Sequence, residues 1–290
     1  MRSEPMRSIL EAQHPEGWWV KPGGGYSPKY TGTVWELIFL DQLGADADDF
    51  RIQRACDYVL EHALTTSGGF GASGAKRDGP LPPSRVIHCL NGNLMRALLG
   101  FDRIDDVRVQ AAIDWAARAI TGNGVECYYA SGTSGPGFAC AANDKRPCAW
   151  GAVKELLGLA RIPLSRRSHL VSDAIDQGTE FLLSRDPSVA DYPMPLRDAK
   201  PSSSWFKLGF PSGYVTDVLQ NLEALAELGK AKDPRLGNAL RWVEEQQEKG
   251  RWTNRYAYNG KTVVDFERRG QTSKWVTLRA CTVLKAAWSD

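Results

Sequence analysis

Hydrophobic positions along the chain recur at helical spacing, and the amphipathic segments alternate with long irregular stretches. Three segments resemble one another, at residues 40–59, 98–116 and 225–243. Each has an apolar helix that ends near glycine, an acidic turn, and Asp-x-Arg at the start of a second helix. A degenerate fourth copy lies at 159–183, between the second and third. The pattern therefore predicts a repeat of about 60 residues, made of a helical hairpin and a loop.

The repeat predicts five hairpins, each with an inner and an outer helix. We expect the inner helices at residues 31–43, 89–100, 148–160, 213–228 and 273–286. We expect the outer helices at residues 6–14, 50–63, 107–120, 168–184 and 234–248. The loops between them are long, and loops of such length inside a compact domain are usually functional. Because no linker divides the chain, we expect one all-α domain over residues 1–290.

Charge and composition exclude several classes of partner. The 36 Lys and Arg residues nearly balance 34 Asp and Glu residues, and no basic run occurs, so we expect no nucleic-acid partner. No apolar stretch approaches the roughly 20 residues that span a bilayer, and the N-terminus lacks the apolar core of a signal peptide. Six cysteines without a secretory signal predict a cytoplasmic protein with free or metal-bound thiols. We expect a monomer or a homo-oligomer.

A short motif occurs near each end of the chain, in phase with the helical repeat. Residues 13–19 (QHPEGWW) and 247–252 (QEKGRW) both contain Gln followed by Gly-x-Trp, with a weaker echo at 68–70 (GGF). The glutamine can hydrogen-bond backbone groups at the end of the outer helix, and the tryptophan can stack across the following turn. The motif is thus a local device for joining helices.

These segments resemble the QW motif of squalene cyclases and the wider terpenoid cyclase/protein prenyltransferase superfamily. Residues 135–157 and 272–286 also resemble short bacterial prenyltransferase/squalene-oxidase-repeat proteins. The resemblance covers essentially the whole chain at the level of the repeat. It implies an (α/α) toroid, in which inner and outer helices close into a ring around a cavity for a hydrophobic substrate.

Residues 46–49 (DADD) formally match DxDD, the motif that carries the proton donor in class II terpene cyclases. The repeat aligns Asp49 with Asp106 at the start of an outer helix, away from the cavity. A carboxylate there meets free backbone amides and the positive end of the helix dipole. We therefore interpret this segment as a helix cap. The sequence contains no DDxxD-type motif for a metal and diphosphate.

A second candidate group combines a histidine with cysteines. His88 and Cys89 stand at the start of the second inner helix, Cys140 and Cys148 flank the entry to the third, and Cys127 lies upstream. In a toroid the N-terminal ends of inner helices meet at one mouth, so these side chains are expected to converge. Thiols at a helix N-terminus have a lowered pKa, which suits metal binding or acid–base chemistry.

Three interpretations of this group stay open. The first is a zinc site built from Cys89, Cys140 and Cys148 with His88 or Cys127, although the spacing lacks the tight C-x2-C pattern. The second is metal-free acid–base chemistry by His88, Cys140 and Cys148. That set is similar in order and type to the His and two Cys of linalool dehydratase–isomerase, which is also an α/α barrel. The third is a set of ordinary buried thiols.

The start of the fourth inner helix supplies a further acid. Asp217 and Tyr214 are three residues apart, which places them on one face of the predicted helix. An aspartic acid that faces an apolar cavity has a raised pKa and can donate a proton. The alternative is that Asp217 caps the helix or pairs with an arginine.

Aromatic residues provide the clue to the substrate. The chain has 10 Trp and 9 Tyr residues, more than packing of the repeats requires. An aromatic-lined cavity accepts hydrophobic ligands and stabilises cationic intermediates. The candidate lining residues lie at the starts of inner helices or in the loops before them: Trp35, Tyr128, Tyr129, Trp150, Tyr214 and Trp275.

Together these patterns predict a small-molecule enzyme with a hydrophobic, isoprenoid-like substrate. The reaction is expected to begin with proton transfer and to be a cyclisation, isomerisation or dehydration. The donor or base would be Asp217, His88, Cys140 or Cys148, and zinc is the one cofactor left open. Two other functions remain: a non-catalytic binding module with a structural zinc, and a subunit like a prenyltransferase β chain, which requires a separate α partner.

Overall fold

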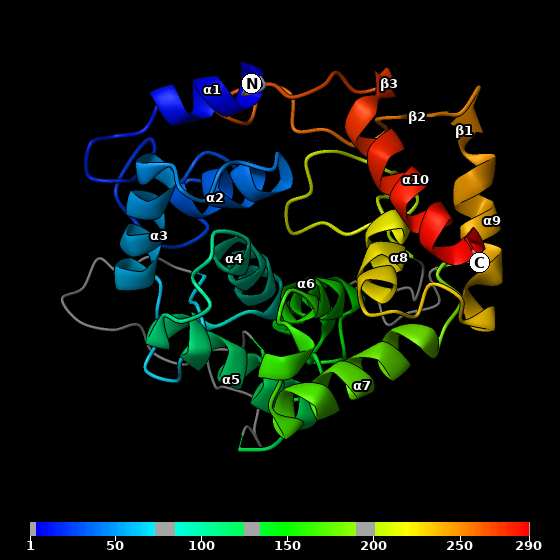
Figure 1. The fold of residues 1–290 in the computed structure, drawn as a ribbon, viewed down its shortest axis with the longest axis horizontal. Coiled ribbons are helices and arrows are strands. Elements are labelled where there is room, and N and C mark those ends of the chain that lie inside the picture. Colours follow the sequence, from blue (N-terminus) through cyan, green and yellow to red (C-terminus); the bar gives the residue numbers. More distant parts are fainter. Residues whose placement is uncertain (1–3, 73–84, 125–133, 190–200, 290) are drawn as a thin grey trace.

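The computed structural model describes residues 4–72, 85–124, 134–189 and 201–289, and these ranges are mostly helical (Figure 1). They contain ten α-helices, with three short strands near the C-terminal end. Within these ranges no helix is both long and apolar enough to cross a membrane. The prediction of a mainly helical chain is therefore confirmed.

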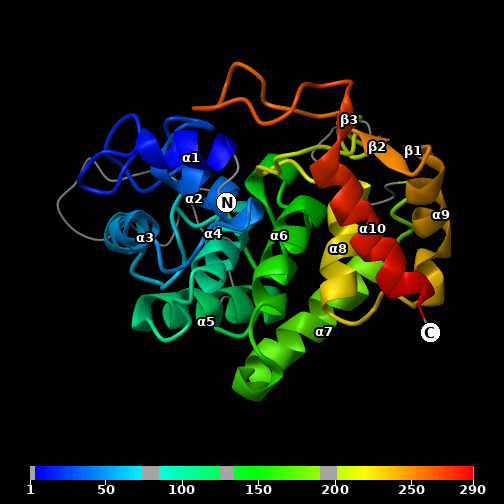
Figure 2. The same ribbon diagram turned by 45° about the horizontal axis from the view of Figure 1, so that its top comes forward.

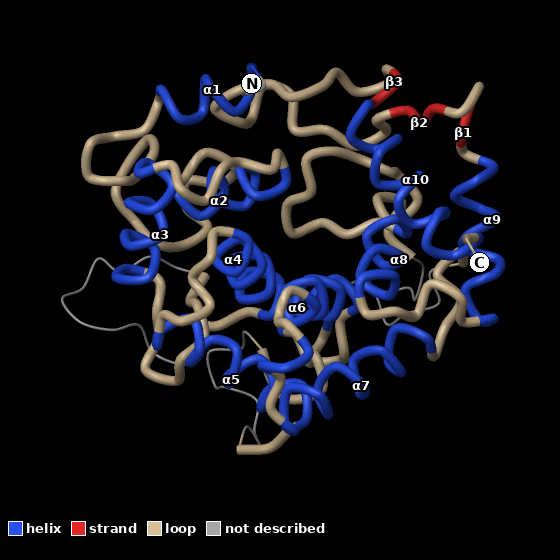
Figure 3. Tube along the Cα trace, viewed as in Figure 1, coloured by secondary structure: helices blue, strands red, loops and turns tan. Residues whose placement is uncertain are grey.

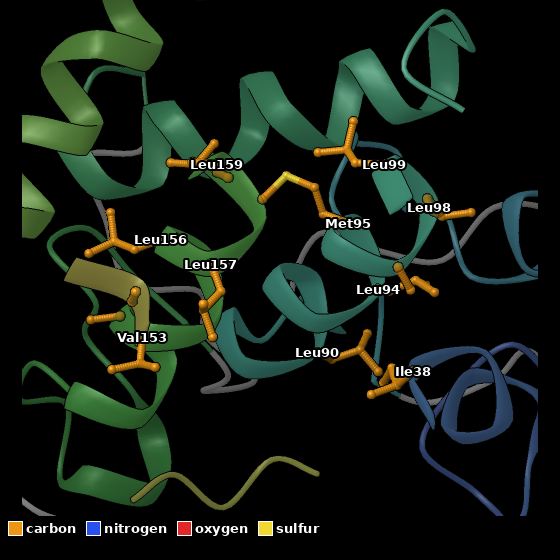
Figure 4. Close-up of a cluster of buried hydrophobic side chains, with 14 of the residues drawn as sticks. Ile38, Leu90, Leu94, Met95, Leu98, Leu99, Val153, Leu156, Leu157 and Leu159 are labelled. Atoms are coloured by element: carbon orange, nitrogen blue, oxygen red, sulfur yellow. The ribbon is translucent and has the colours of Figure 1, made fainter. Parts of the chain in front are cut away.

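Five helices form an inner row, in which each contacts the next along the chain. They are α2 (Thr33–Gln42), α4 (His88–Gly100), α6 (Ala149–Ala160), α8 (Val218–Glu227) and α10 (Lys274–Trp288). Helices α4 and α6 approach closely because Gly92 lies between them: a Cβ atom there would stand 2.3 Å from the backbone nitrogen of Glu155. Leucine side chains fill the rest of this contact, and Ile38 of α2 lies beside Leu90 of α4 (Figure 4).

Five helices form an outer row, which lies around the outside of the inner helices (Figures 1 and 2). They are α1 (Glu4–Glu11), α3 (Phe50–His62), α5 (Val107–Thr121), α7 (His169–Leu183) and α9 (Gly237–Glu245). Each outer helix packs on an inner helix that is next to it in the sequence, and α9 contacts both α8 and α10. Long loops connect the two rows (Figure 3). The strands β1 (Gln247–Glu248), β2 (Arg251–Thr253) and β3 (Thr272–Ser273) form a small antiparallel sheet next to α10.

Three aspartates each cap the start of the second helix of a hairpin, and all three do so with the same hydrogen bonds. Asp49, Asp106 and Asp233 each accept a hydrogen bond of 2.9 Å from the backbone N–H of the arginine two residues on. The guanidinium group of that arginine returns to the same carboxylate. The interpretation of residues 46–49 as a helix cap is therefore confirmed.

The fourth inner helix begins later than the sequence predicts. It starts at Val218, and Asp217 is its N-cap, accepting a hydrogen bond of 2.9 Å from the backbone N–H of Gln220. Tyr214 therefore lies in the preceding loop and does not share a helix face with Asp217, which corrects the sequence-based expectation. Aspartate is a strongly preferred N-cap, and its hydrogen bond to Gln220 fits a helix that starts at Val218.

The two Gln…Gly-x-Trp segments fold alike. The indole N–H of Trp19 donates to the carbonyl of Ile9 at 2.7 Å, and that of Trp252 donates to the carbonyl of Val243 at 2.7 Å. Both carbonyls belong to the preceding outer helix, α1 or α9. The backbone N–H of each tryptophan also donates to a threonine hydroxyl in the next inner helix. Each motif therefore ties an outer helix to the inner helix that follows it.

The two ends of the inner row, α2 and α10, are linked through aromatic rings in loops. Phe39 of α2 lies 5.3 Å from Phe266, measured between ring centroids, and Phe266 lies 5.9 Å from Phe210. Phe210 in turn stacks on Trp275 of α10 at 5.0 Å. The side-chain amide of Gln42, at the end of α2, also contacts the loop that contains Phe210. It donates a hydrogen bond to the carbonyl of Ser212 and accepts one from the backbone N–H of the same residue.

Ion pairs join the inner helices, and two of the three lie at the C-terminal ends of these helices. The pairs are Arg279–Glu223 at 2.5 Å, Arg96–Glu227 at 3.2 Å and Arg161–Asp41 at 3.2 Å. Two of them reach past an intervening helix: Arg96 connects α4 to α8, and Asp41 connects α2 to the residue after α6. These two pairs therefore hold inner helices together across the helix that lies between them.

Candidate functional site

Aromatic and thiol side chains gather at the N-terminal ends of the inner helices. The Tyr214 ring lies 6.2 Å from Trp35 of α2 and 6.4 Å from Trp150 of α6, measured between centroids. The Tyr26 hydroxyl lies 3.5 Å from the Cys89 sulfur of α4. Segments far apart in the sequence therefore meet at the N-terminal ends of the inner helices, a place that we call the mouth of the inner helices.

Five rings form an aromatic cluster in this mouth: Tyr26, Tyr30, Trp35, Tyr214 and Tyr258. Tyr26 stacks on Trp35 with 4.6 Å between centroids, and Tyr30 lies 4.4 Å from Tyr258. Tyr30, Trp35 and Tyr258 are buried, whereas Tyr26 and Tyr214 are only partly buried. Tyr26 and Tyr214 are therefore the members of the cluster that keep some exposed surface.

A lysine ammonium covers part of the aromatic cluster. Lys29 Nζ donates a hydrogen bond of 2.9 Å to the Tyr214 hydroxyl, and it lies 4.7 Å from the centroid of that ring and 5.0 Å from that of Tyr30. Burial raises the pKa of Tyr214, but the hydrogen bonds from Lys29 and Tyr30 outweigh burial, so the phenol pKa is lowered overall. Tyr214 therefore ionises more readily than an ordinary tyrosine.

Two thiols in the mouth differ sharply in their readiness to ionise. The hydrogen bond from Cys148 lowers the pKa of Cys140 to about 6, although burial opposes this shift. The same hydrogen bond, together with burial, raises the pKa of Cys148 well above its ordinary value. Within the pair, Cys140 is therefore the thiol that ionises more readily. Burial also raises the pKa of Cys89 to about 11, so that this thiol stays protonated next to Tyr26.

His88, expected to be catalytic, lies in a buried hydrogen-bonded group. Its Nε2 is 3.0 Å from the carbonyl oxygen of Gly135, and its Nδ1 is 3.2 Å from Oε1 of Glu155. Asn91 donates to the same carboxyl group at 3.2 Å. Both ring nitrogens of His88 are therefore engaged, and neither is left for a substrate or a metal ion.

The described residues do not form the expected zinc site. Among the described residues, no three His, Cys, Asp or Glu side chains are grouped so that they could hold a metal ion. Of the predicted ligands, Cys89 lies against the hydroxyl of Tyr26, and the free thiols of Cys140 and Cys148 are hydrogen-bonded to each other. Both ring nitrogens of His88 already have partners. Cys127, the alternative ligand, lies outside the described residues.

Asp217 has both carboxylate oxygens engaged by backbone amides. One oxygen accepts from Gln220 at 2.9 Å, and the other accepts from Gly209 at 3.1 Å. Burial raises the pKa of Asp217, and the nearby Arg279 guanidinium opposes that shift. This arrangement matches the alternative role that the sequence left open, a helix cap close to an arginine.

The remaining aromatic candidates fall in different places. Trp275 belongs to the aromatic link between α2 and α10, where it stacks on Phe210. Tyr128 and Tyr129 lie outside the described residues. Of the six predicted lining residues, the structure therefore brings Trp35, Trp150 and Tyr214 together.

Two charged residues of the inner helices are buried, and sequence reasoning did not single out Lys154. Lys154 of α6 is completely buried, and its amine bonds to the side-chain oxygen of Gln220 and, at 3.4 Å, to the carbonyl of Val215. Glu36 of α2 is buried, and neither of its carboxyl oxygens has a hydrogen-bond partner among the described residues. The available signal was a charged residue inside an otherwise apolar inner helix.

Comparison with known proteins finds structures with a similar fold but identifies no family. No family model matches the chain, and no curated protein matches its sequence. A crystal structure of a protein from Actinoplanes superposes with a TM-score of 0.53 and 14% identity, over 100% of this chain and 76% of that one. This likeness shows a shared fold alone.

A second solved structure, the type II terpene cyclase MstE from Scytonema, gives a TM-score of 0.49 and 15% identity, over 98% of this chain and 71% of that one. A variant of MstE in complex with its substrate, geranylgeranyl dihydroxybenzoate, gives the same values.

Proposed function

We propose that this protein is an enzyme that moves protons to and from a hydrophobic substrate at the mouth of its inner helices. The observation that carries the proposal is the hydrogen-bonded pair of Cys140 and Cys148. Two identical groups whose pKa values are pushed apart supply a base and an acid at the same pH. Cys140 is the base, because it is the thiolate, and Cys148 is an acid.

The aromatic cluster supports a hydrophobic substrate for this reaction. Tyr26 and Tyr214 are only partly buried, and they contact Cys89 and Trp150, respectively. The faces of aromatic rings also stabilise positive charge, and protonation of an alkene or an allylic alcohol generates positive charge on carbon. A cation, the ammonium group of Lys29, already lies over two of these rings. An isoprenoid is a substrate of this type.

The proposed chemistry is an isomerisation, a dehydration or a proton-initiated cyclisation. In a dehydration, the Cys148 thiol gives its proton to the hydroxyl group, which leaves as water, and Cys148 becomes a thiolate. The Cys140 thiolate takes a proton from the neighbouring carbon, and the C–H electrons form the new double bond. The proton on Cys140 can then pass to its hydrogen-bonded partner Cys148, which restores the pair.

We also propose that the helical rows close into a single-domain (α/α) toroid over residues 1–290. The aromatic link between α2 and α10 supports closure, because it spans the two ends of the inner row. The buried apolar side chains form one connected cluster from Met6 to Ala287, which supports a single domain.

The test is an assay with isoprenoid alcohols such as geraniol and linalool, monitored by product analysis. Cys140→Ser is expected to lower kcat by about 10²–10⁴-fold, because serine does not ionise at neutral pH. Activity of the wild-type protein is expected to rise with pH through about 6 as Cys140 ionises. The matched control is Cys281→Ser, at an exposed thiol of α10. Full activity in the Cys140→Ser variant would contradict the proposal.

A further inference from the structure

Lys154 lies one helical turn deeper in the site than Trp150. The two residues are four apart on α6, so they lie on the same face of the helix. The loop before α8 runs along this face: Tyr214 lies near the Trp150 ring, and the carbonyl of Val215 accepts from Lys154 Nζ at 3.4 Å. The loop before α8 therefore brings the Trp150–Tyr214 ring pair and the amine of Lys154 to one face of α6.

The amine of Lys154 has no carboxylate in contact with it among the described residues. Its two acceptors, the side-chain oxygen of Gln220 and the carbonyl of Val215, are both uncharged. Asp217 favours the ammonium form from further away, but its own oxygens accept backbone amides. An ammonium group has three donors and would leave one unmet, whereas a neutral amine uses two and keeps its lone pair.

Burial favours the same neutral state. It lowers the pKa of Lys154 to about 7, so that about half of the amine is unprotonated at neutral pH. A desolvated, neutral lysine is the form that attacks carbonyl groups.

The indole N–H of Trp150 provides a second, independent observation. Among the described residues this buried nitrogen has no hydrogen-bond partner. Buried donors in folded proteins nearly always find an acceptor, and a ligand oxygen would supply one. One face of α6 therefore offers a free donor and, a turn away, an amine with a lone pair. A carbonyl group needs both: a donor for its oxygen and a nucleophile for its carbon.

We propose that the mouth of the inner helices binds a hydrophobic aldehyde or ketone, and that Lys154 holds this substrate as a Schiff base. This inference rests on the proposed function, because it names the substrate class of the same site. The lone pair of Nζ adds to the carbonyl carbon, and both hydrogens of the amine end on the oxygen, which leaves as water. A C=N bond replaces the C=O bond, and no atom is oxidised or reduced overall.

The Schiff base connects Lys154 to the thiol pair. A protonated C=N bond withdraws electrons and acidifies the C–H bonds next to it. The Cys140 thiolate is the base in the same mouth, and removal of such a proton leads to isomerisation or to loss of a β-hydroxyl group as water. The two parts of the site thus act in one sequence of steps.

The experiment traps the Schiff base by reduction. Wild-type protein is incubated at pH 7 with geranial, an isoprenoid aldehyde, and sodium cyanoborohydride, and is then analysed by intact mass and peptide mapping. The expected adduct adds the mass of the aldehyde less one oxygen atom, and it maps to Lys154. Lys154→Met is expected to lose this adduct, whereas Lys261→Met, at an exposed lysine, keeps it. Circular dichroism checks that both variants fold.

A second measurement needs no variant. In wild-type protein, labelling of Lys154 is expected to be half-maximal near pH 7, where its amine loses the proton. Exposed lysines are expected to need a pH near about 10.4. Adducts spread over exposed lysines, with none on Lys154 at any pH, would overturn the proposal.

The outcome is separable from that of the proton-transfer proposal, because trapping requires no turnover. An adduct on Lys154 in the Cys140→Ser variant supports the carbonyl site even if the alcohol assay finds no activity. Conversely, isoprenoid alcohols converted by wild-type protein that never forms the adduct would support proton transfer and refute the Schiff base.

Discussion

The imidazole of His88 and the carboxyl group of Glu155 lie 3.2 Å apart in the interior and share one proton. Because the carbonyl of Gly135 can only accept, Nε2 of His88 carries a hydrogen. The second proton lies either on Nδ1 or on Glu155, and the pair is neutral overall in both cases. The pair thus joins α4 to α6 without burying a net charge.

Removal of the carboxylate from this pair is expected to destabilise the protein. Glu155→Gln should lower the free energy of unfolding by about 1–3 kcal/mol, because Asn91 donates to both carboxyl oxygens and either placement of the amide turns one of them into a donor. Urea denaturation at pH 7 measures the change. The matched control is Glu61→Gln on the exposed surface of α3, and an equally small loss in both variants would refute the structural role of the pair.

The thiolate of Cys140 is expected to depend on its neighbour. Iodoacetamide should alkylate Cys140 with a half-maximal rate near pH 6, while Cys89 and Cys56 react slowly, because burial raises their pKa values to about 11 and about 12. Cys148→Ala removes the hydrogen bond, so the midpoint for Cys140 should move up toward about 8.5. Peptide mass spectrometry gives the rate at each site. An unchanged midpoint in the variant would exclude Cys148 as the cause.

Glu36 is expected to make stability fall as pH rises. Burial raises its folded-state pKa well above 4.5, so above pH 4.5 the unfolded chain has lost a proton that the folded protein keeps. The free energy of unfolding should therefore fall, by up to about 1.4 kcal/mol per pH unit, until the folded-state pKa is reached.

Glu36→Gln removes this proton linkage while it keeps the size of the side chain. Variant and wild-type protein should differ by a constant amount below pH 4.5, and the variant should gain on the wild-type protein as pH rises to 8. Urea denaturation across this range measures both curves, with the exposed Glu61→Gln variant as control. Parallel curves for Glu36→Gln would show that the buried carboxyl group ionises normally.

The two Gly-x-Trp segments are expected to contribute equally and independently. Trp19→Phe and Trp252→Phe each remove a buried indole hydrogen bond to an outer-helix carbonyl, so each should cost about 1–3 kcal/mol of unfolding free energy. The two sites share no partner, and the double variant should show the sum. Trp18→Phe is the matched control, because its indole N–H bonds only to Glu16 at the surface. A strongly non-additive double variant would contradict this assignment.

The helices and their starts could be predicted because the forces that set them are local. The apolar spacing marks which residues turn inward, and an aspartate such as Asp106 caps the helix that follows it. The prediction failed at the start of α8, where the loop is held by distant residues: Asn93 donates to the carbonyl of Gly213, and Gln42 bonds to Ser212. No local pattern contains those contacts.

The candidate site divides in the same way. The sequence by itself determined the order of helices, the caps and the placement of Cys140, Cys148 and Trp150 around the start of one inner helix. Tertiary structure decided the partners, such as Glu155 for His88 and Gln220 for Lys154, which are more than 60 residues apart in the chain. The physical reason is that hydrogen bonding and desolvation set the charge of each group, and both depend on which distant side chains the packed helices bring beside it.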